Sequence, residues 1–417
     1  MLITTAPRGT KDLVPGESYK WQYVEDKFRE VCDEFNYKET RVPTFEHTEL
    51  FERGVGDTTD VVEKQMYTFL DKGGRSVTLR PEGTASVARS FLQNSLYADT
   101  MPAKMYYNIP CFRYEKSQKG RLREFHQFGV EVFGAKEPTI DAEVISLALT
   151  FLDRVGLKDL TVHINSIGCK ECRKAYNEKL REYFRPHLSE LCETCRGRFE
   201  RNPLRIIDCK SEICREIGKG APVLLDYICD DCREHFEKFK TCLDNMGIKY
   251  EIDPGIVRGL DYYSKTVFEI ISGDFTVCGG GRYDGLVEEL GGSPSPAIGF
   301  GLGIERLLLR LEETGVTIPQ REKLDLYVAP LGEKASVYAQ KLVYSLRRAG
   351  VKTETDHTGR GLRAQMKYAD KLGCRYSVVL GDNEIENGEA AVKNMETGEQ
   401  TQVKLDKLTD FFNERNI

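Results

Sequence analysis

The sequence predicts an α/β protein that is divided into more than one domain. A chain of 417 residues is long enough for two or three separate hydrophobic cores. Residues 105–133 have the alternating, aromatic-rich pattern of a β-hairpin, and residues beyond about 320 alternate between strand and helix patterns. Because 40% hydrophobic and 30% charged residues are ordinary values for a globular protein, we do not expect extensive disorder.

The first third of the chain is expected to begin with a helix and to contain one clear hairpin. Ser18 to Tyr37 carries apolar and aromatic residues at helical spacing. This helix should end before residues 38–50, because Pro43 is not tolerated in a helix interior. Met105 to Tyr114 and Phe125 to Phe133 then predict two strands joined by a basic loop.

Glycine-rich strand patterns follow in the middle of the chain. Thr266 to Ile271 and Phe275 to Cys278 predict short strands, and Gly279 to Gly281 come directly after them. Pro296 to Leu302 is expected to lead into a helix from Gly303 to Glu313.

The last part of the chain predicts a small parallel α/β domain, with a boundary near residues 317–322. Its expected strands are Leu324 to Leu331, Val351 to Asp356 and Arg375 to Leu380, and its expected helices are Lys334 to Ala349 and Leu362 to Leu372.

Charge and hydropathy restrict the partners and the compartment. A net charge of −6 argues against indiscriminate nucleic-acid binding, although a locally basic surface can still hold a specific RNA. The apolar runs are too short and too interrupted to span a bilayer, and the amino terminus lacks a basic stretch followed by an apolar one. We therefore expect a cytoplasmic protein that does not insert into membranes.

Cysteines are concentrated in one segment. The chain has 13 cysteines, and clustering in a reducing compartment favours metal ligation over disulfides. Cys169-x₂-Cys172 followed by Cys192-x₂-Cys195 fits a common spacing of structural zinc sites. The candidate ligands, enough for one or two tetrahedral sites, are Cys169, Cys172, Cys192, Cys195, Cys209, Cys214, Cys229 and Cys232. Bound zinc and metal-free buried or free thiols are both open interpretations.

The predicted hairpin carries residue types that suit a nucleotide. Alternation places Arg113 and Glu115 on one face of its first strand, and Phe125, Gln127 and Glu131 are available from its second. A guanidinium can bind phosphate, a carboxylate can accept from an adenine amino group, and an aromatic ring can stack on a base. A hairpin with charges alone is more often a solvated face, so this pattern needs support from elsewhere.

A second glycine-rich pattern gives that support. It lacks the G-x-G-x-x-G register of dinucleotide folds, and the chain has no G-x-x-x-x-G-K-[ST] loop, so both common nucleotide loops are excluded. What remains is a glycine-lined strand that enters a helix with Arg306 in its first turn. The helix dipole disfavours a cation at this position unless the cation binds an anionic ligand. The pattern reads Gly299-Phe300-Gly301-Leu302-Gly303-Ile304-Glu305-Arg306.

Together, the proline-bearing strand at Pro43, the hairpin and the glycine-lined strand resemble the three signature motifs of the class II aminoacyl-tRNA synthetases. Further motifs resemble the histidyl-tRNA synthetase family within that class. They are Pro7-Arg8-Gly9-Thr10-Lys11-Asp12, Thr78-Leu79-Arg80-Pro81-Glu82-Gly83-Thr84, Gly255-Ile256-Val257-Arg258-Gly259-Leu260-Asp261-Tyr262-Tyr263 and Cys278-Gly279-Gly280-Gly281-Arg282-Tyr283-Asp284-Gly285. The resemblance runs from about residue 6 to the carboxyl terminus, and the motif around Arg258 is its most specific part.

The resemblance implies a particular architecture and activity. Residues 1–320 would form a class II catalytic domain built on an antiparallel sheet, with a helical, cysteine-bearing insertion at about 168–235. Residues 324–417 would form an α/β anticodon-binding domain. The family activates L-histidine with ATP and Mg²⁺ to histidyl-adenylate, transfers the histidyl group to the 3′ end of tRNA(His), and is homodimeric.

The family's functional residues map onto this chain one by one. Arg113 and Arg258 would be catalytic, beside the α-phosphate and the histidine carboxylate. The ATP-binding residues implied by the resemblance are Arg113, Glu115, Arg121, Phe125 and Arg306. The implied histidine-binding residues are Glu82, Gly83, Thr84, Arg113, Gln127, Glu131, Arg258, Tyr262 and Tyr263.

Two other classes of function are alternatives to an active enzyme. A catalytically silent relative, such as a regulatory subunit or a tRNA-sensing module, tends to lose the ATP arginines or the last domain. This chain retains Arg113, Arg258, Arg306 and that domain, which favours an enzyme. A metal-dependent regulator built on the cysteine segment would leave the other motifs unexplained.

Overall fold

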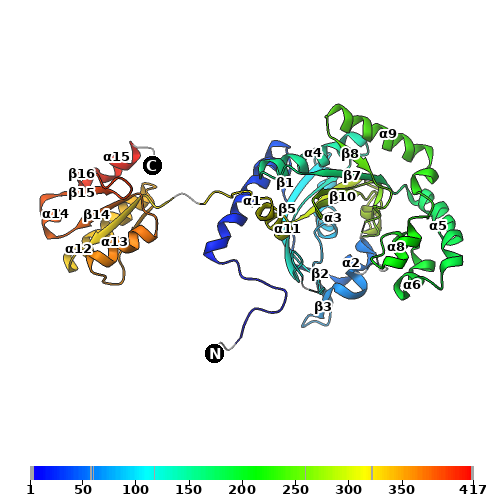
Figure 1. Ribbon diagram of the computed structural model, residues 1–417, viewed down its shortest axis with the longest axis horizontal. Coiled ribbons are helices and arrows are strands. Elements are labelled where there is room, and N and C mark those ends of the chain that lie inside the picture. The colour runs from blue at the N-terminus through cyan, green and yellow to red at the C-terminus, as the bar shows by residue number, and fades with distance from the viewer. Residues whose placement is uncertain are drawn as a thin grey trace. The chain divides into compact units, whose positions relative to one another are not determined.

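The computed structural model describes residues 4–56, 59, 61–116, 118–258, 260–320 and 323–414. The chain divides into two compact units, Met1–Pro319 and Gln320–Ile417, and each unit has its own sheet (Figure 1). Within the described residues, no helix has both the length and the apolar composition needed to cross a membrane.

An eight-stranded sheet forms the centre of the first unit, and its strands are antiparallel except at the two edges, where β1 pairs with β5 and β7 with β8 in parallel. In spatial order the strands are β1 (Lys38–Glu39), β5 (Ala103–Phe112), β6 (Glu124–Phe133), β11 (Ala297–Gly303), β10 (Phe275–Arg282), β9 (Ser264–Ser272), β7 (Thr161–Ser166) and β8 (Tyr250–Ile252).

In the middle of this sheet, three adjacent strands contribute glycines to the same row. Tyr107, Gly129, Gly301, Gly279 and Glu269 are paired in register across five neighbouring strands, so three glycines stand side by side between a tyrosine and a glutamate. The sequence pattern predicts a strand that ends at residue 278, but β10 continues through the three glycines because both of its edges are paired.

Two long helices cover the opposite face and close the main core. They are α1 (Pro15–Glu34) and α4 (Pro138–Arg154). Phe28 of α1 stacks on Phe128 of β6 with a ring-centroid distance of 4.4 Å. The first helix starts three residues earlier than the apolar spacing predicts, since Pro15 suits a first turn whose N–H groups have no intrahelical acceptor.

A smaller sheet, followed in the chain by α3, supports the site side of the large sheet. Its strands, in spatial order, are β2 (Phe45–His47), β4 (Ser76–Leu79) and β3 (Tyr67–Leu70). The buried guanidinium of Arg80 donates to the carbonyls of Val42, Pro43 and Pro110 at 2.7, 2.8 and 2.6 Å, which joins this sheet to the main one. The adjoining helices are α2 (Thr48–Val55), α3 (Thr84–Gln93) and α10 (Leu286–Glu289). Helix α11 (Ile304–Glu313) follows β11 and packs in the main core against β6 and β10.

A helical segment is inserted between β7 and β8, and it carries eight of the cysteines. Its helices are α5 (Lys170–Phe184), α6 (Glu193–Arg201), α7 (Leu204–Ile207), α8 (Glu212–Gly218) and α9 (Asp230–Asn245). Short turns of helix occur at η1 (Val61–Gln65), η2 (Leu96–Ala98), η3 (Arg185–His187), η4 (Leu224–Tyr227) and, in the second unit, η5 (Leu405–Lys407).

A buried carboxylate ties the insertion to the main sheet. Asp141 of α4 has no exposed surface and accepts from Arg282 of β10 at 2.7 Å, from Thr266 of β9 at 2.7 Å and from His235 of α9 at 2.8 Å. A buried charge of this kind is tolerated only with several good partners. The network therefore fixes α4 and α9 against the strands that carry the glycines.

The second unit is a five-stranded sheet with helices. The predicted strand and helix alternation is confirmed, and the three predicted strands pair in parallel. The pattern missed β15 and β16, which add to β14 in antiparallel fashion. The strands in spatial order are β13 (Thr353–Thr355), β12 (Leu326–Pro330), β14 (Tyr376–Leu380), β15 (Glu389–Asn394) and β16 (Gln400–Lys404). The helices are α12 (Glu333–Arg348), α13 (Leu362–Lys371), α14 (Asp382–Asn387) and α15 (Leu408–Asn413).

Candidate active site

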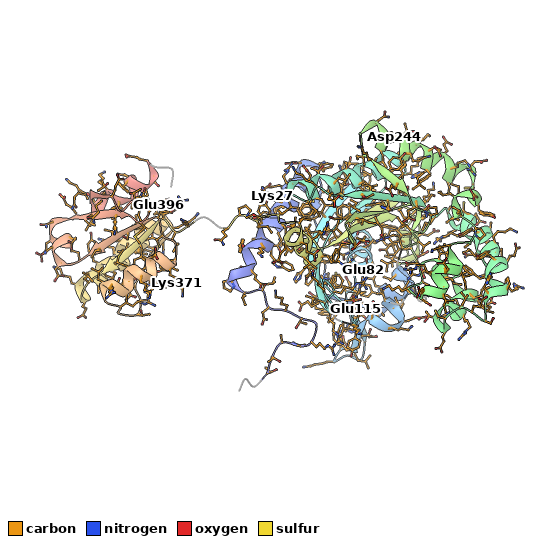
Figure 2. The ribbon with its side chains drawn as sticks, in the orientation of Figure 1. Lys27, Glu82, Glu115, Asp244, Lys371 and Glu396 are labelled. Atoms are coloured by element: carbon orange, nitrogen blue, oxygen red, sulfur yellow. The ribbon has the colours of Figure 1, made fainter. Side chains whose placement is uncertain are left out.

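A cavity of about 710 Å³ lies over the glycine-rich part of the large sheet. Glu82 and Glu115, which line it, lie toward the middle of the first unit in Figure 2, whereas Lys27 and Asp244 lie at its periphery. The predicted site residues that line the cavity are Glu82, Thr84, Arg113, Glu115, Arg121, Phe125, Gln127, Arg258, Tyr262, Tyr263 and Arg306. Gly83 and Glu131 are not among its lining residues.

Glu82 lies at the start of α3, where its carboxylate accepts the backbone N–H groups of Thr84 and Ala85, both at 2.8 Å. The hydroxyl of Tyr262 approaches the same carboxylate at 3.5 Å. Burial raises the pKa of Glu82, while these N–H donors oppose the shift. An acidic group is thus held at the cavity wall by backbone donors, with room for a cationic ligand group.

The alternation pattern predicts that Arg113 lies on a strand. In the structure β5 ends at Phe112, so Arg113 lies just beyond the strand. Its Nε donates to the carbonyl of Pro81 at 2.8 Å, and the guanidinium lies 5.2 Å from the ring centroid of Phe125. The side chain is therefore fixed by one hydrogen bond and one cation–π contact. Arg121 lies 3.6 Å from Glu115 across the loop that joins the two strands.

Gln127 and Glu131 project from β6 toward the glycines of β11. A methyl group added at Gly301 would lie 2.0 Å from the Gln127 amide, and one added at Gly299 would lie 1.9 Å from the Glu131 carboxylate. Only glycine leaves space for these two side chains.

Glu131 is completely buried beneath the cavity. Its carboxylate accepts hydroxyl hydrogen bonds from Thr84 at 2.7 Å, from Tyr107 at 3.1 Å and from Tyr283. Burial raises its pKa to about 8, against the lowering effect of the Tyr283 and Thr84 hydroxyls. Its direct contact with histidine stays a prediction, since its present partners are protein hydroxyls.

Arg258 is held in an unusual backbone conformation, with φ at +59°. Its guanidinium pairs with Glu269 of β9 and lies 5.8 Å from the Tyr263 ring, while Nε is buried without a hydrogen-bond partner among the described residues. A methyl group added at Gly279 would lie 2.4 Å from its Nη2. The guanidinium therefore lies directly on the glycine floor.

Arg306 occupies the first turn of α11, as predicted, and donates to the carbonyl of Thr276 at 3.2 Å. Its Nε is also buried without a hydrogen-bond partner in the described part of the chain. Burial and the nearby charge of Arg121 lower the pKa of Arg306. An anion in the cavity would offset both effects.

Three further residues that line the cavity are not among the predicted site residues. Glu269 pairs with Arg258, Arg205 donates to the Arg258 carbonyl, and Glu305 accepts from the backbone N–H and Nδ1 of His126 at 2.9 and 3.0 Å. Glu269 could have been found, because a lone acidic residue in the apolar run from Val267 to Ile271 is unusual for a buried strand. Arg205 has no comparable signal in the sequence.

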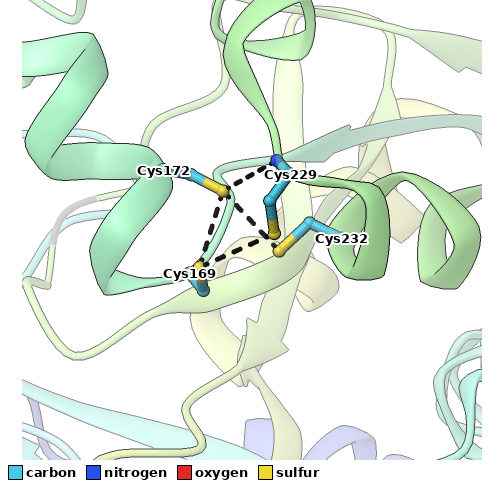
Figure 3. Close-up of side chains that lie close together, drawn as sticks. All are labelled: Cys169, Cys172, Cys229 and Cys232. Carbon is cyan, nitrogen blue, oxygen red and sulfur yellow. Dashed lines mark hydrogen bonds between the residues drawn. The ribbon is translucent and has the colours of Figure 1, made fainter.

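The cysteines of the insertion form two groups of four, and within each group the sulfur atoms lie within 4.8 Å of one another. The first cysteine group is Cys169, Cys172, Cys229 and Cys232, and its side chains point toward one another in Figure 3. The second cysteine group is Cys192, Cys195, Cys209 and Cys214.

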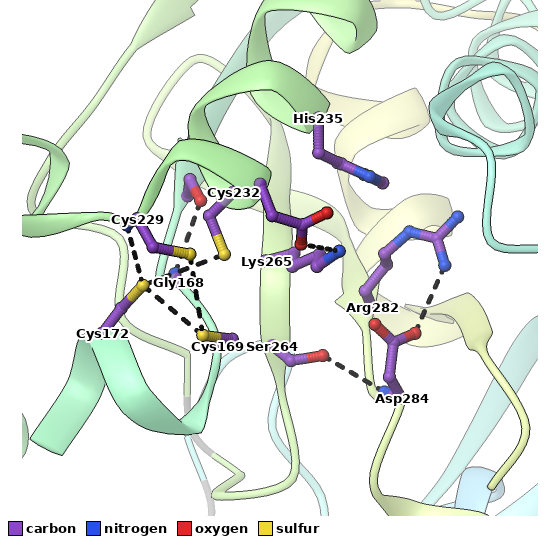
Figure 4. Close-up of polar contacts among 12 residues, drawn as sticks. Gly168, Cys169, Cys172, Cys229, Cys232, His235, Ser264, Lys265, Arg282 and Asp284 are labelled. Carbon is purple, nitrogen blue, oxygen red and sulfur yellow. Dashed lines mark hydrogen bonds and ion pairs between the residues drawn. The ribbon is translucent and has the colours of Figure 1, made fainter.

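The spacing pattern that joins Cys169-x₂-Cys172 to Cys192-x₂-Cys195 in one site is wrong. Each pair instead meets cysteines further along the chain. For the first pair, the start of α5 lies beside the start of α9, where the Cys229 N–H donates to the Cys172 sulfur at 3.1 Å. Figure 4 shows the first cysteine group beside Gly168 and Lys265, where the insertion joins β9 through the Lys265 N–H and the Gly168 carbonyl at 2.9 Å.

The sulfur geometry fits a tetrahedral metal site. A zinc ion at about 2.3 Å from four thiolates places the sulfurs about 3.8 Å apart. Sulfur pairs lie at 3.5, 4.0 and 3.9 Å in the first group, and Cys192 lies 3.9 Å from Cys209 in the second. Burial opposes ionisation of Cys169 and Cys192, but N–H donors from the following helix turn lower the pKa of each to about 7.

Two family models match the chain. One, described as histidyl-tRNA synthetase, matches residues 9–178 and 223–307, and another, described as an anticodon binding domain, matches residues 325–415. The first leaves residues 179–222 unmatched, and these contain the whole second cysteine group.

Individual relatives are similar over nearly the whole chain. A histidine–tRNA ligase of Acetivibrio thermocellus is 59% identical, covering 98% of this chain and 99% of its own, and one of Clostridium novyi is 57% identical, covering 97% of each. The crystal structure of apo S. aureus histidyl-tRNA synthetase has a TM-score of 0.85 at 42% identity, covering 98% of this chain and 100% of its own. The catalytic fold, the second unit and this degree of identity together show that the chain belongs to the histidyl-tRNA synthetase family.

Proposed function

We propose that this chain activates L-histidine with ATP to histidyl-adenylate and transfers the histidyl group to the 3′ end of tRNA(His). The observation that carries the proposal is the convergence of Arg113, Arg258 and Arg306 on one cavity that also contains the buried Glu82. Three guanidiniums suit a triphosphate and a carboxylate, and the acid suits an ammonium group.

The chemistry of adenylation explains why positive charge dominates the site. The histidine carboxylate attacks the α-phosphorus of ATP and is already ionised, so the step needs no general base. Catalysis then consists of alignment and of stabilising negative charge as it develops on the phosphate. In this proposal Arg113 and Arg258 act at the α-phosphate and the carboxylate. The buried Nε of Arg258, which has no hydrogen-bond partner among the residues that the structure describes, supports that role.

ATP would lie along the hairpin and α11. Phe125 would stack on adenine, Glu115 would accept from the adenine amino group, and Arg121 and Arg306 would bind the outer phosphates. Mg²⁺ would balance the triphosphate charge when it is bound. Glu269 and Glu305 place carboxylates in the same cavity, which are ligands of the kind that Mg²⁺ prefers.

Histidine would lie over the glycine floor. Glu82, Thr84 and Gln127 would accept from the α-ammonium group, with Gly83 as backbone lining, while Glu131 and the pair Tyr262 and Tyr263 would define the imidazole end. The hydroxyl-bonded, buried Glu131 supports this assignment, because a fixed polar group at a pocket floor discriminates against apolar isosteres that leave it unpaired.

The domain assignment follows the same proposal. Residues 1–320 would be the catalytic domain with an insertion at about 168–235, and residues 324–417 would bind the anticodon of tRNA(His). We place the reaction in the cytoplasm, where tRNA is charged for protein synthesis.

ATP–pyrophosphate exchange measured with each of the twenty amino acids tests the proposed activity. Exchange with histidine is expected to exceed exchange with any apolar isostere by roughly 10⁴-fold, because the site hydrogen-bonds polar groups of its ligand. Exchange with no amino acid would remove the enzyme assignment, and preferred exchange with another amino acid would remove the histidine assignment.

We also propose that the insertion binds structural zinc at both cysteine groups. In support, the sulfurs lie at tetrahedral-edge distances, and all three Cys-x₂-Cys pairs place their first cysteine at a helix N-cap and their second three residues later, where N–H groups stabilise thiolates.

Elemental analysis of protein purified without added metal measures this directly. We expect about two zinc ions per chain, one for each four-cysteine group. Less than about a tenth of an equivalent would show that the eight cysteines are metal-free thiols, and iron in place of zinc would reject the assignment of the metal.

A homodimer completes the proposal. Phe45, Phe69 and Leu70 are 55%, 49% and 70% exposed on the small sheet, which is unusual for a surface that stays in water. In the family, the helix before Pro43, here α1, and the chain through Pro43 build the subunit interface, and Phe45 lies two residues beyond Pro43. Sedimentation equilibrium is expected to give twice the chain mass of 47.5 kDa, and a mass of one chain at micromolar concentration would contradict the dimer.

A further inference from the structure

The second cysteine group lies in the wall of the active-site cavity rather than at a distance from it. Cys192 and Cys209 line the cavity themselves, together with Thr194, Arg198, Arg205 and Asp208 from the same segment. The segment leaves the cavity at α8, whose third residue is Cys214. The cysteines therefore enclose the stretch of insertion that faces the proposed substrates.

Hydrogen bonds organise the sulfurs of this group. The N–H of Cys192 donates to the sulfur of Cys214 at 3.2 Å, and the N–H of Ser211 donates to the sulfur of Cys209 at 3.4 Å. Amide donors of this kind orient thiolate ligands and stabilise their negative charge. Cys195 and Cys214 are buried, so the side of the group away from the cavity is closed.

The stretch between Cys195 and Cys209 holds the loop that carries Arg258. Arg205, on the short helix α7, is buried, and its guanidinium donates to the backbone carbonyl of Arg258. The side-chain amide of Asn202 donates to the Asp261 carboxylate at 3.1 Å, and Arg198 donates to the Arg205 carbonyl at 3.2 Å. This stretch thus contacts the loop at both Arg258 and Asp261.

Arg258 needs such support because its backbone is left-handed, with φ at +59°. Residues with a side chain rarely adopt this conformation, and it persists only where neighbouring contacts over-determine it. The stretch of three helices from α6 to α8 has no β-strand that could hold Arg205 in place, so the position of Arg205 depends on the fold of the cysteine segment.

We propose that a zinc ion at the second cysteine group positions Arg258 for adenylation through Arg205, so that occupancy of this metal site sets the fraction of active enzyme. Arg205 is a positioning residue in this scheme, because it acts on the backbone of Arg258. The first cysteine group serves a separate purpose, since it joins the start of α5 to the start of α9. The inference rests on the proposed histidine activation.

A matched pair of cysteine variants separates the two metal sites. Cys195→Ser and Cys232→Ser each replace a buried cysteine that is the third residue of a helix. Each is expected to lose one zinc equivalent. Cys195→Ser should lower kcat of histidine-dependent pyrophosphate exchange by about 10- to 100-fold. Cys232→Ser should lower the unfolding temperature but keep kcat within about threefold.

Arg205 variants separate positioning from metal binding. Arg205→Met is expected to retain both zinc ions, to lower kcat as Cys195→Ser does, and to leave KM for ATP within about twofold. Arg205→Lys, which keeps a donor, should recover at least about a third of the lost rate. Because both changes act on one element, the double variant Cys195→Ser/Arg205→Met should be no slower than the slower single variant.

Each outcome decides a different point. Normal kcat in folded Arg205→Met, or multiplied losses in the double variant, would overturn the positioning role even if zinc is bound. Normal kcat in Cys195→Ser that has lost one zinc would overturn the role of the metal. Absence of histidine-dependent exchange in the unmodified chain would instead overturn the proposed function itself.

Discussion

The glycine row across the large sheet is the constraint on which the rest of the site depends. Three adjacent strands offer Gly129, Gly301 and Gly279 in register, between Tyr107 and Glu269. With no side chains there, neighbouring functional groups can lie flat against the backbone. The space that the missing methyl groups leave at Gly279, Gly299 and Gly301 is occupied by Arg258, Glu131 and Gln127, respectively.

This floor also determines the electrostatics of the site. Side chains that lie on a sheet lose water, so each charge needs a partner within the protein or on a ligand. Glu131 is satisfied by hydroxyls, and Arg258 by Glu269, whereas the Nε atoms of Arg258 and Arg306 have no partner among the described residues. Guanidinium groups that are desolvated, held in a fixed orientation and incompletely paired stabilise a phosphate strongly.

Much of the architecture could be predicted from the sequence, and what could not has a physical reason. The hairpin, the glycine-lined strand and the helix that starts near Arg306 follow from local periodicity, which needs no knowledge of distant contacts. The end of β5 before Arg113, the extension of β10 and the added strands β15 and β16 depend on which edges are paired. Such pairing is a tertiary property.

The cysteine segment shows the same limit more sharply. The number of ligands and their helix-start positions could be inferred, but the pairing of Cys172 with Cys232 rather than with Cys195 depends on helix packing. The link from Arg205 to the Arg258 carbonyl is likewise formed by residues far apart in the sequence. The residue types indicate which ligands and charges are available, but which of them meet in space depends on the fold.

Histidine-dependent pyrophosphate exchange by the Gly279→Ala variant tests the glycine floor most directly. The added methyl must displace the Arg258 guanidinium, so we predict a fall in kcat of roughly 10²-fold. Gly361→Ala, at the start of α13 in the second unit, where an added methyl meets no atom within 4 Å, serves as the control and should exchange normally. A Gly279→Ala chain that folds and exchanges as fast as this control would contradict the account.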